Sequence, residues 1–125
     1  MKKRLAAVLG ACTLLLTACG GSKISKNEKL QKDMEAKAYT VKITEDESLG
    51  SILTANKDND FLYLYRLNAA EDTENFYDMF ANGNTQYDRL YQFQDDSRLG
   101  NVVICATETA FADSGIIIAE GDQKQ

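Results

Sequence analysis

The side chains that usually carry catalysis are scarce in this chain of 125 residues, which contains no histidine and only three cysteines. A serine or cysteine nucleophile needs a base, usually histidine, and a zinc site needs several cysteine or histidine ligands. The composition therefore excludes Ser-His and Cys-His arrangements and argues against zinc. No glycine-rich phosphate loop or dinucleotide-binding motif is present. We expect no catalytic residue, no metal site and no cofactor.

Carboxylates are the chemical groups that remain. Asp58-Asn59-Asp60 and Asp95-Asp96 lie in segments with the composition of turns, where oxygen ligands for Ca²⁺ can gather. The first segment lacks the following glycine and the distal glutamate of a calcium loop, and a turn aspartate usually bonds its own backbone. Paired carboxylates for glycoside hydrolysis are a further alternative, but a domain of this size leaves little room for a deep sugar cleft. We expect a non-enzyme, with a cation- or solute-binding sensor or a small envelope hydrolase as alternatives.

Tyrosine is the unusual residue type, since five of the six tyrosines lie between residues 63 and 91. Tyrosine suits recognition surfaces because it joins apolar area to a polar tip. It also suits strands, and we favour that simpler explanation. A protein or peptide partner is compatible with these residues, but the sequence assigns no binding residue.

The first 18 residues have the pattern of a secretory signal. Lys2, Lys3 and Arg4 give a positive start, and residues 5–18 form a run of 14 uncharged, mostly apolar residues. As a helix this run is roughly 21 Å long at about 1.5 Å per residue, whereas a transmembrane helix needs about 20 residues. We therefore predict a cleaved signal peptide rather than a transmembrane helix.

The end of this run, Leu16-Thr17-Ala18-Cys19, resembles the lipobox of bacterial lipoproteins. The resemblance implies a diacylglyceryl group on the Cys19 sulfur, cleavage before Cys19, and Cys19 as the new N-terminus. Membrane lipid attached there would hold the domain on the extracytoplasmic side of the cell membrane, because two acyl chains anchor stably. Cys12 also ends a lipobox-like order, but the apolar run before it is at the lower length limit. We favour Cys19.

Lipidation of Cys19 changes what the remaining residues can do. Cleavage removes Cys12, so Cys105 has no intramolecular disulfide partner and is expected to be a small core residue. Loss of three of the 14 basic residues leaves 11 against 19 acidic ones. Residues 23–42 hold six lysines and three acids, which suits an anionic lipid surface, whereas the acidic remainder argues against nucleic acid. Solubility is a plainer explanation of both charges, and we favour it.

Near the anchor, periodicity predicts a helix over residues 26–37 with a capping box formed by Ser25 and Glu28. The apolar stripe of this helix is thin and consists chiefly of Leu30 and Met34. A helix of this kind is either a solvated stalk or lightly docked.

Strands are predicted from alternation or from β-branched and aromatic content at residues 39–44, 61–67, 87–94 and 101–107. Residues 49–56 fit either a short helix or a strand. The short turn before residue 61 favours a hairpin of residues 51–56 with 61–67 over the helix.

Two more helices follow from apolar spacing. One runs to residue 82, is capped by Asp72 or Thr73, and ends in left-handed backbone at Gly83. The other covers residues 108–114, with Thr107 as its cap and Gly115 as its stop. Residues 116–119 are expected to be a brief strand or a docking segment.

The order of these elements indicates an α+β fold, a mainly antiparallel sheet with helices packed on one face and preceded by an N-terminal helix. No internal repeat is visible. The predicted organisation is a lipoprotein signal peptide at 1–18, a lipid-anchored tether and N-terminal helix at 19–38, a single small α+β domain at 39–120 and a frayed tail at 121–125. Within the tether, residues 20–22 are expected to be flexible.

Three segments beyond the lipobox, residues 61–67, 76–80 and 100–107, are similar to small uncharacterised lipoproteins of clostridia-like bacteria. These segments hold no mechanistic motif, so the resemblance implies no functional residues. Together with the lipobox, it implies a membrane-anchored extracytoplasmic lipoprotein with a small acidic, non-catalytic binding or accessory domain.

Overall fold

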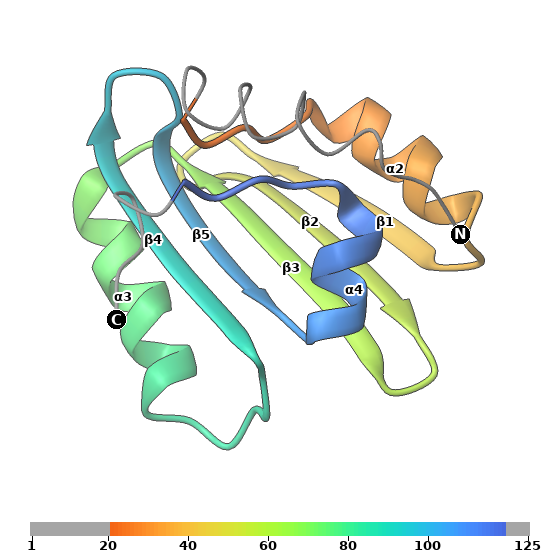
Figure 1. Ribbon diagram of the computed structural model, residues 1–125. Helices are drawn as coiled ribbons and strands as arrows, with labels where there is room; N and C mark the ends of the chain where they lie inside the picture. The colour runs from red at the N-terminus through yellow and green to blue at the C-terminus, as the bar shows by residue number, and fades with distance from the viewer. Residues whose placement is uncertain (1–20, 120–125) are drawn as a thin grey trace.

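The computed structural model describes residues 21–119, so the predicted signal peptide, Cys19 and the tail at 121–125 lie outside the described residues. Within that range the chain folds as α+β, with a five-stranded sheet and three helices (Figure 1). The elements in chain order are α2 (Asn27–Glu35), β1 (Thr40–Asp46), β2 (Gly50–Lys57), β3 (Asp60–Leu67), α3 (Ala70–Ala81), β4 (Arg89–Asp96), β5 (Gly100–Ala106) and α4 (Glu108–Ser114).

The strands form one antiparallel sheet in the order β1-β2-β3-β5-β4. Helices α2 and α4 cover one face, and α3 covers the other (Figure 1). The expectation that the helices pack on one face is therefore wrong. The reason lies in β5, where Val102 to Ala106 are all buried. Successive side chains of a strand point to opposite faces, so both faces of β5 need a helix to exclude water.

Core A, the hydrophobic cluster on the side of α2 and α4, is the larger of the two. Leu30 and Met34 place α2 in this core, and both are fully buried. Helix α2 is therefore part of the fold rather than a solvated stalk. The buried members of core A are Leu30, Met34, Tyr39, Leu53, Ala55, Leu62, Leu64, Tyr91, Phe93, Val102, Ile104, Ala106, Ala110 and Ile116.

Core B, the cluster under α3, is smaller and more aromatic. Its buried members are Leu67, Phe80, Leu90, Val103 and Cys105. Aromatic side chains of β3 surround them: the Tyr65 ring stacks on Phe76 with 4.5 Å between ring centroids, and Tyr63 lies 6.0 Å from Phe80. These ring contacts stabilise the packing of α3 on the sheet beyond the contribution from buried apolar area.

The fold contains an internal repeat that the sequence analysis missed. The units α2-β1-β2 and α3-β4-β5 have the same order of elements, and their hairpins flank β3 on its two sides. Since β1, β3 and β4 run in one direction and β2 and β5 in the other, an approximate two-fold axis along β3 relates the units. A rotation about that axis exchanges the two faces of the sheet, which explains why α2 and α3 lie on opposite faces.

The turns of the two hairpins carry the same pattern, Asp-x-x-Leu-Gly, 50 residues apart. The Asp46 carboxylate accepts hydrogen bonds from the N–H groups two and three residues on, at 2.9 and 3.0 Å. Asp96 does the same at 2.8 and 2.9 Å. Leu49 packs on core B and Leu99 on core A, as the exchange of faces requires. A register shift in β4 between residues 93 and 96 changes the spacing and hides the repeat in the sequence.

The predicted hairpin between residues 51–56 and 61–67 is confirmed. Strands β2 and β3 pair in antiparallel register from Gly50 opposite Leu67 to Lys57 opposite Asp60. The helix considered for residues 49–56 is wrong. Only two residues connect β2 to β3, so residues 49–56 lie directly alongside β3 as a strand and cannot form a helix there. Asp58, in that turn, adopts φ 54°.

The predicted capping box of α2 is wrong. The helix begins after Lys26 without a side-chain cap. The carbonyl of Ser25 instead accepts a hydrogen bond from Arg66, and Glu28 is exposed. The hydrogen bond from Arg66 of β3, rather than a capping box, therefore fixes the start of α2.

The predicted start of α3 and its left-handed glycine stop are wrong, whereas the predicted end at residue 82 agrees to within one residue with the observed end at Ala81. The helix begins at Ala70, and Thr73 lies inside it, where its hydroxyl donates to the Ala70 carbonyl at 2.6 Å and accepts from the Gln92 amide at 2.9 Å. Gly83 does not adopt left-handed backbone. A Cβ at that position would lie 2.5 Å from the Met79 carbonyl oxygen, so close approach explains the glycine.

The ends of α4 agree better with expectation. The helix begins after Thr107 and ends at Gly115, which adopts left-handed backbone with φ 76°. The Thr107 hydroxyl does not cap the helix but accepts a hydrogen bond from the Phe61 N–H at 3.1 Å. Ile116, which follows the stop, is buried.

The segment before α2 is held in place rather than flexible. Lys23 and Ile117 form an antiparallel β-bridge, and Ser22 is only 2% exposed. The expectation of flexibility is therefore wrong at Ser22, and docking of residues 116–119 is confirmed. Residues 116–119 thus pack against the segment before α2, so the two ends of the described chain lie together.

Candidate functional site

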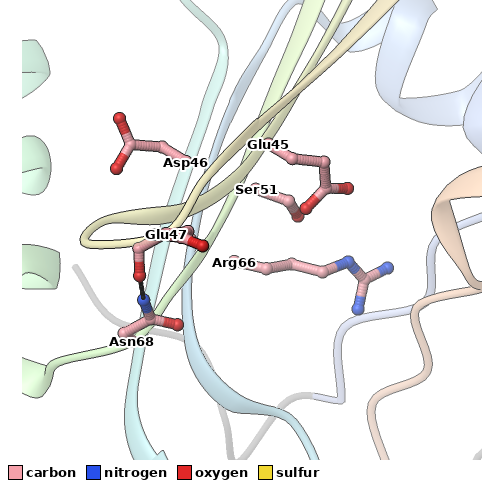
Figure 2. Close-up of a pocket in the computed structure, with 7 residues that line it drawn as sticks. Glu45, Asp46, Glu47, Ser51, Arg66 and Asn68 are labelled. Carbon is pink, nitrogen blue, oxygen red and sulfur yellow. Dashed lines mark hydrogen bonds between the residues drawn. The ribbon is translucent and has the colours of Figure 1, made fainter.

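A polar groove lies at the end of the sheet where β1, β2 and β3 meet the start of α2. We call it the Arg66 groove. Its main part has a volume of about 450 Å³ and is lined by Glu45, Asp46, Glu47, Gly50, Ser51, Arg66 and Asn68 (Figure 2). A smaller part of about 210 Å³ adjoins it, because Glu45 and Arg66 also line that part, together with Lys26, Asn27, Glu28 and Ile43.

Strand register places the central side chains of the groove. Glu45 of β1 lies opposite Ser51 of β2, and Ser51 lies opposite Arg66 of β3. The three side chains therefore project from one face of the sheet, and Glu45 and Arg66 extend in the same direction (Figure 2). On β3, Leu62 and Leu64 precede Arg66 on this face and belong to core A. Arg66 thus stands where core A gives way to solvent.

Hydrogen bonds hold the Arg66 guanidinium against the first residues of α2. Its Nε donates to the Asn27 side-chain oxygen at 3.0 Å, and one Nη donates to the Ser25 carbonyl. The Asn27 amide in turn donates to the Ser51 hydroxyl at 3.1 Å. These bonds use two of the five N–H donors of a guanidinium. Arg66 lines both parts of the groove and forms no ion pair with a described residue.

The charge around Arg66 is mixed. Burial lowers the pKa of Arg66, and the negative charge of Glu28 opposes that effect. The turn from Glu45 to Glu47 adds three carboxylates, all of them exposed. Hydrogen bonds lower the pKa of Asp46, first from the Ser48 hydroxyl and then from backbone N–H groups. The groove therefore offers a partly buried cation beside an exposed acidic turn.

This arrangement suits recognition more than reaction. A general acid works by a carboxyl group whose pKa is raised in an apolar site, whereas the groove carboxylates of the described chain stand in solvent. A guanidinium with free donors binds a carboxylate or a carbonyl. Nearby carboxylates bind a basic group. A polar peptide segment presents both kinds of partner.

The turn carboxylates considered from the sequence do not line the Arg66 groove. Asp58 and Asp60 lie at the β2–β3 turn and Asp95 and Asp96 at the β4–β5 turn. Asp96 bonds the backbone of its own turn. Residues 21–119 contain no group of three or more acidic, cysteine or histidine side chains that could hold a metal ion.

Cys105 and most tyrosines take part in packing. Cys105 is fully buried in β5, as expected. Tyr91 belongs to core A, and the remaining tyrosines of residues 63–91 pack against core B. The preferred explanation, that tyrosines suit strands, holds for Tyr63, Tyr65 and Tyr91, whereas Tyr77 lies in α3 and Tyr87 precedes β4. Cys19 lies outside the described residues.

Sequence reasoning missed Arg66 as a binding residue. The signal was present, since Arg66 is the single cation in the apolar run of residues 61–67 and follows Leu62 and Leu64 at the same spacing of two. What the sequence did not show was that Asn27, about 40 residues away, meets it. That contact depends on how α2 lies on the sheet.

In the range 21–119, no helix combines the length and apolar character that crossing a bilayer requires. Comparisons with protein-family models, with curated proteins and with solved structures found no match to this chain.

Proposed function

We propose that this chain is a lipid-anchored accessory lipoprotein on the extracytoplasmic side of the cell membrane, and that its acidic domain binds a protein or peptide without catalysis. The observation that carries the location is the order Leu16-Thr17-Ala18-Cys19 behind a basic start and an apolar run. Support for binding comes from the Arg66 groove. A peptide carboxylate or carbonyl would meet the free donors of Arg66, and a basic side chain would meet the acidic turn.

The location is tested by replacing the lipidated residue. We expect Cys19→Ser to abolish incorporation of labelled fatty acid and to move the chain from the membrane to the soluble fraction, because no thioether can form at serine. Cys12→Ser is the matched control and should change neither result. Acylation that persists in Cys19→Ser and is lost in Cys12→Ser would move the anchor to Cys12. Acylation of neither wild type nor variant would end the lipoprotein proposal.

The binding proposal is tested by crosslinking in intact cells followed by mass spectrometry of captured proteins. We expect Glu45→Gln combined with Glu47→Gln to reduce capture of a partner, since both carboxylates line the groove and are exposed. Glu71→Gln combined with Glu74→Gln removes the same charge from the exposed side of α3 and should leave capture unchanged. Equal capture in both variants would show that the partner does not use the Arg66 groove.

A further inference from the structure

Three hydrogen bonds join the first described residues to the last, and a fourth joins them to the β4–β5 turn. The Lys23 N–H donates to the Ile117 carbonyl at 2.7 Å, and the Ile117 N–H donates back at 3.0 Å. The Ala119 N–H donates to the Ser22 hydroxyl at 2.7 Å, and the Arg98 guanidinium donates to the Ser22 carbonyl at 3.2 Å. Ser22 is therefore a fixed point of the fold.

The fixed point lies very close to the predicted lipid. Only Gly20 and Gly21 separate Cys19 from Ser22. Three residue steps reach at most about 11 Å, at roughly 3.3–3.6 Å per residue. Arg98 packs against Gly21, where a Cβ would lie 2.7 Å from its guanidinium. An acyl group on Cys19 would thus keep Ser22 and its neighbours near the headgroups, with little freedom to swing.

The surface around this fixed point is suited to an anionic bilayer. Ile117 is one of two large apolar side chains that the described chain exposes, at 40%. Lys23, its bridge partner, is exposed, as is Lys26. Helix α2 adds the exposed Lys29 and Lys32, and Lys37 follows the helix, so residues 23–37 hold five lysines against three acids. Ile24, Ile116 and Ile118 pack on core A, so this surface belongs to the face of the sheet that carries α2 and α4 (Figure 1).

Resting on the lipidation proposed above, we propose that the acylated domain lies face-on against an anionic bilayer, with Ile117 at the lipid and the lysines of residues 23–37 at the headgroups. The end-on alternative would direct the turn at 46–50 and the turn at 96–100 toward the headgroups. Those turns carry Asp46, Glu47 and Asp96 against a single cation, Arg98, so an anionic surface repels their net negative charge. The face-on pose directs lysine and an apolar side chain to the bilayer, and α3 with the far face of the sheet to the solvent.

The chain offers matched reporters for this orientation, because it contains no tryptophan. Ile117 and Met79 are the two exposed large apolar side chains, and Met79 lies on α3 at the opposite face, 50% exposed. We would prepare the lipidated chain as Ile117→Trp and as Met79→Trp in vesicles of phosphatidylglycerol and brominated phosphatidylcholine. We expect bromine to quench the fluorescence of the Ile117→Trp chain, and contact with the lipid to shift its emission to the blue. The fluorescence of the Met79→Trp chain should be unchanged.

The results separate this proposal from the one it rests on. Flotation with the vesicles, lost in Cys19→Ser, reports the anchor independently of the reporters. If the chains float and Met79→Trp is the quenched one, the domain lies on its other face. If they float and neither is quenched, the domain stands away from the lipid. Either result overturns the face-on pose and leaves lipidation intact. Lys23→Glu with Lys26→Glu should weaken quenching of Ile117→Trp, and an unchanged signal would show that the lysines do not set the pose.

Discussion

Cys105 is a residue whose surroundings determine its chemistry. Its side chain is fully buried in β5, and burial raises the pKa of the thiol to about 12. An unfolded cysteine has a pKa of about 8.5, so the native state holds this proton more tightly. The resulting stability is fully present below pH 8.5 and is lost as the pH rises from there toward 12. We expect native protein to resist iodoacetamide at pH 8 and unfolded protein to react at once.

Two substitutions check the origin of this behaviour. Cys105→Ala should lower the free energy of unfolding by about 1 kcal/mol through the lost contacts and should flatten its decline above pH 8.5 in urea titrations. Cys105→Ser should cost about 1–3 kcal/mol, because β5 offers a buried hydroxyl no ready acceptor. Burial also raises the pKa of Tyr65 and Tyr77, so alanine removes only part of the decline. An identical decline in wild type and Cys105→Ala would contradict the assignment to the thiol.

The two glycines at equivalent positions of the hairpins provide a comparison at the scale of elements. Gly50 has φ 128°, and a Cβ there would lie 2.1 Å from the Arg66 carbonyl oxygen. Gly100 has φ 79° and no atom within 4 Å of such a Cβ. We expect Gly100→Ala to cost about 1–2 kcal/mol for left-handed backbone alone. Gly50→Ala should cost about 3 kcal/mol or more, since strain and overlap combine.

Urea unfolding of both alanine variants measures this difference. The Gly50→Ala change also presses on the β3 backbone at Arg66, so we expect it to disturb the Arg66 groove, whereas Gly100→Ala should leave that groove intact. Two-dimensional NMR of the Asn27 and Ser51 amides would report the disturbance. Equal costs for the two variants would show that the turns relax freely and that the close approach at Gly50 has little energetic weight.

Element types were more predictable than element ends. Alternation identified β1, whereas aromatic content identified β3, which is apolar on both faces. The predicted helix caps were wrong because the residues concerned bind partners that are distant in the sequence. Arg66 forms a hydrogen bond with the start of α2, and Gln92 forms one with Thr73 within α3. A capping motif in the sequence competes with such tertiary partners and says nothing about them. The same limit explains why the Arg66 groove could not be predicted, as its side chains come from four elements.

At the scale of the molecule, the repeat explains why the coverage of the sheet was mispredicted. Local patterns show that a strand is apolar, but not how many helices share each face. The approximate two-fold axis along β3 places the helices of the two units on opposite faces, and α4 is added on the side of α2. The repeat is hard to see in the sequence, because Asp-x-x-Leu-Gly is the one pattern that we identify in both units. Leu30 and Met34 fix α2 on core A, and Phe76 and Phe80, at the same spacing of four, fix α3 on core B.

The repeat also predicts that each half of the chain needs the other half in order to fold. A break between Asn68 and Ala69 separates the first unit with β3 from the second unit with α4. Neither half is expected to fold alone, although each contains a complete helix-hairpin unit. In the first half, core A would lose Tyr91, Val102 and Ile104, and the aromatic side of β3 would lose α3. The second half would lose the central strand with which β5 pairs.

Mixed in equal amounts, the peptides 21–68 and 69–125 should reassemble, because the break lies in an exposed connection and both cores can then close. Circular dichroism and amide NMR of each peptide and of the mixture test this expectation. The mixture should recover the dispersed spectrum of the intact chain, with stability that depends on concentration. A dispersed spectrum from peptide 21–68 alone would show that one unit with β3 is sufficient, and the interdependence of the two halves inferred from the shared strand would then be wrong.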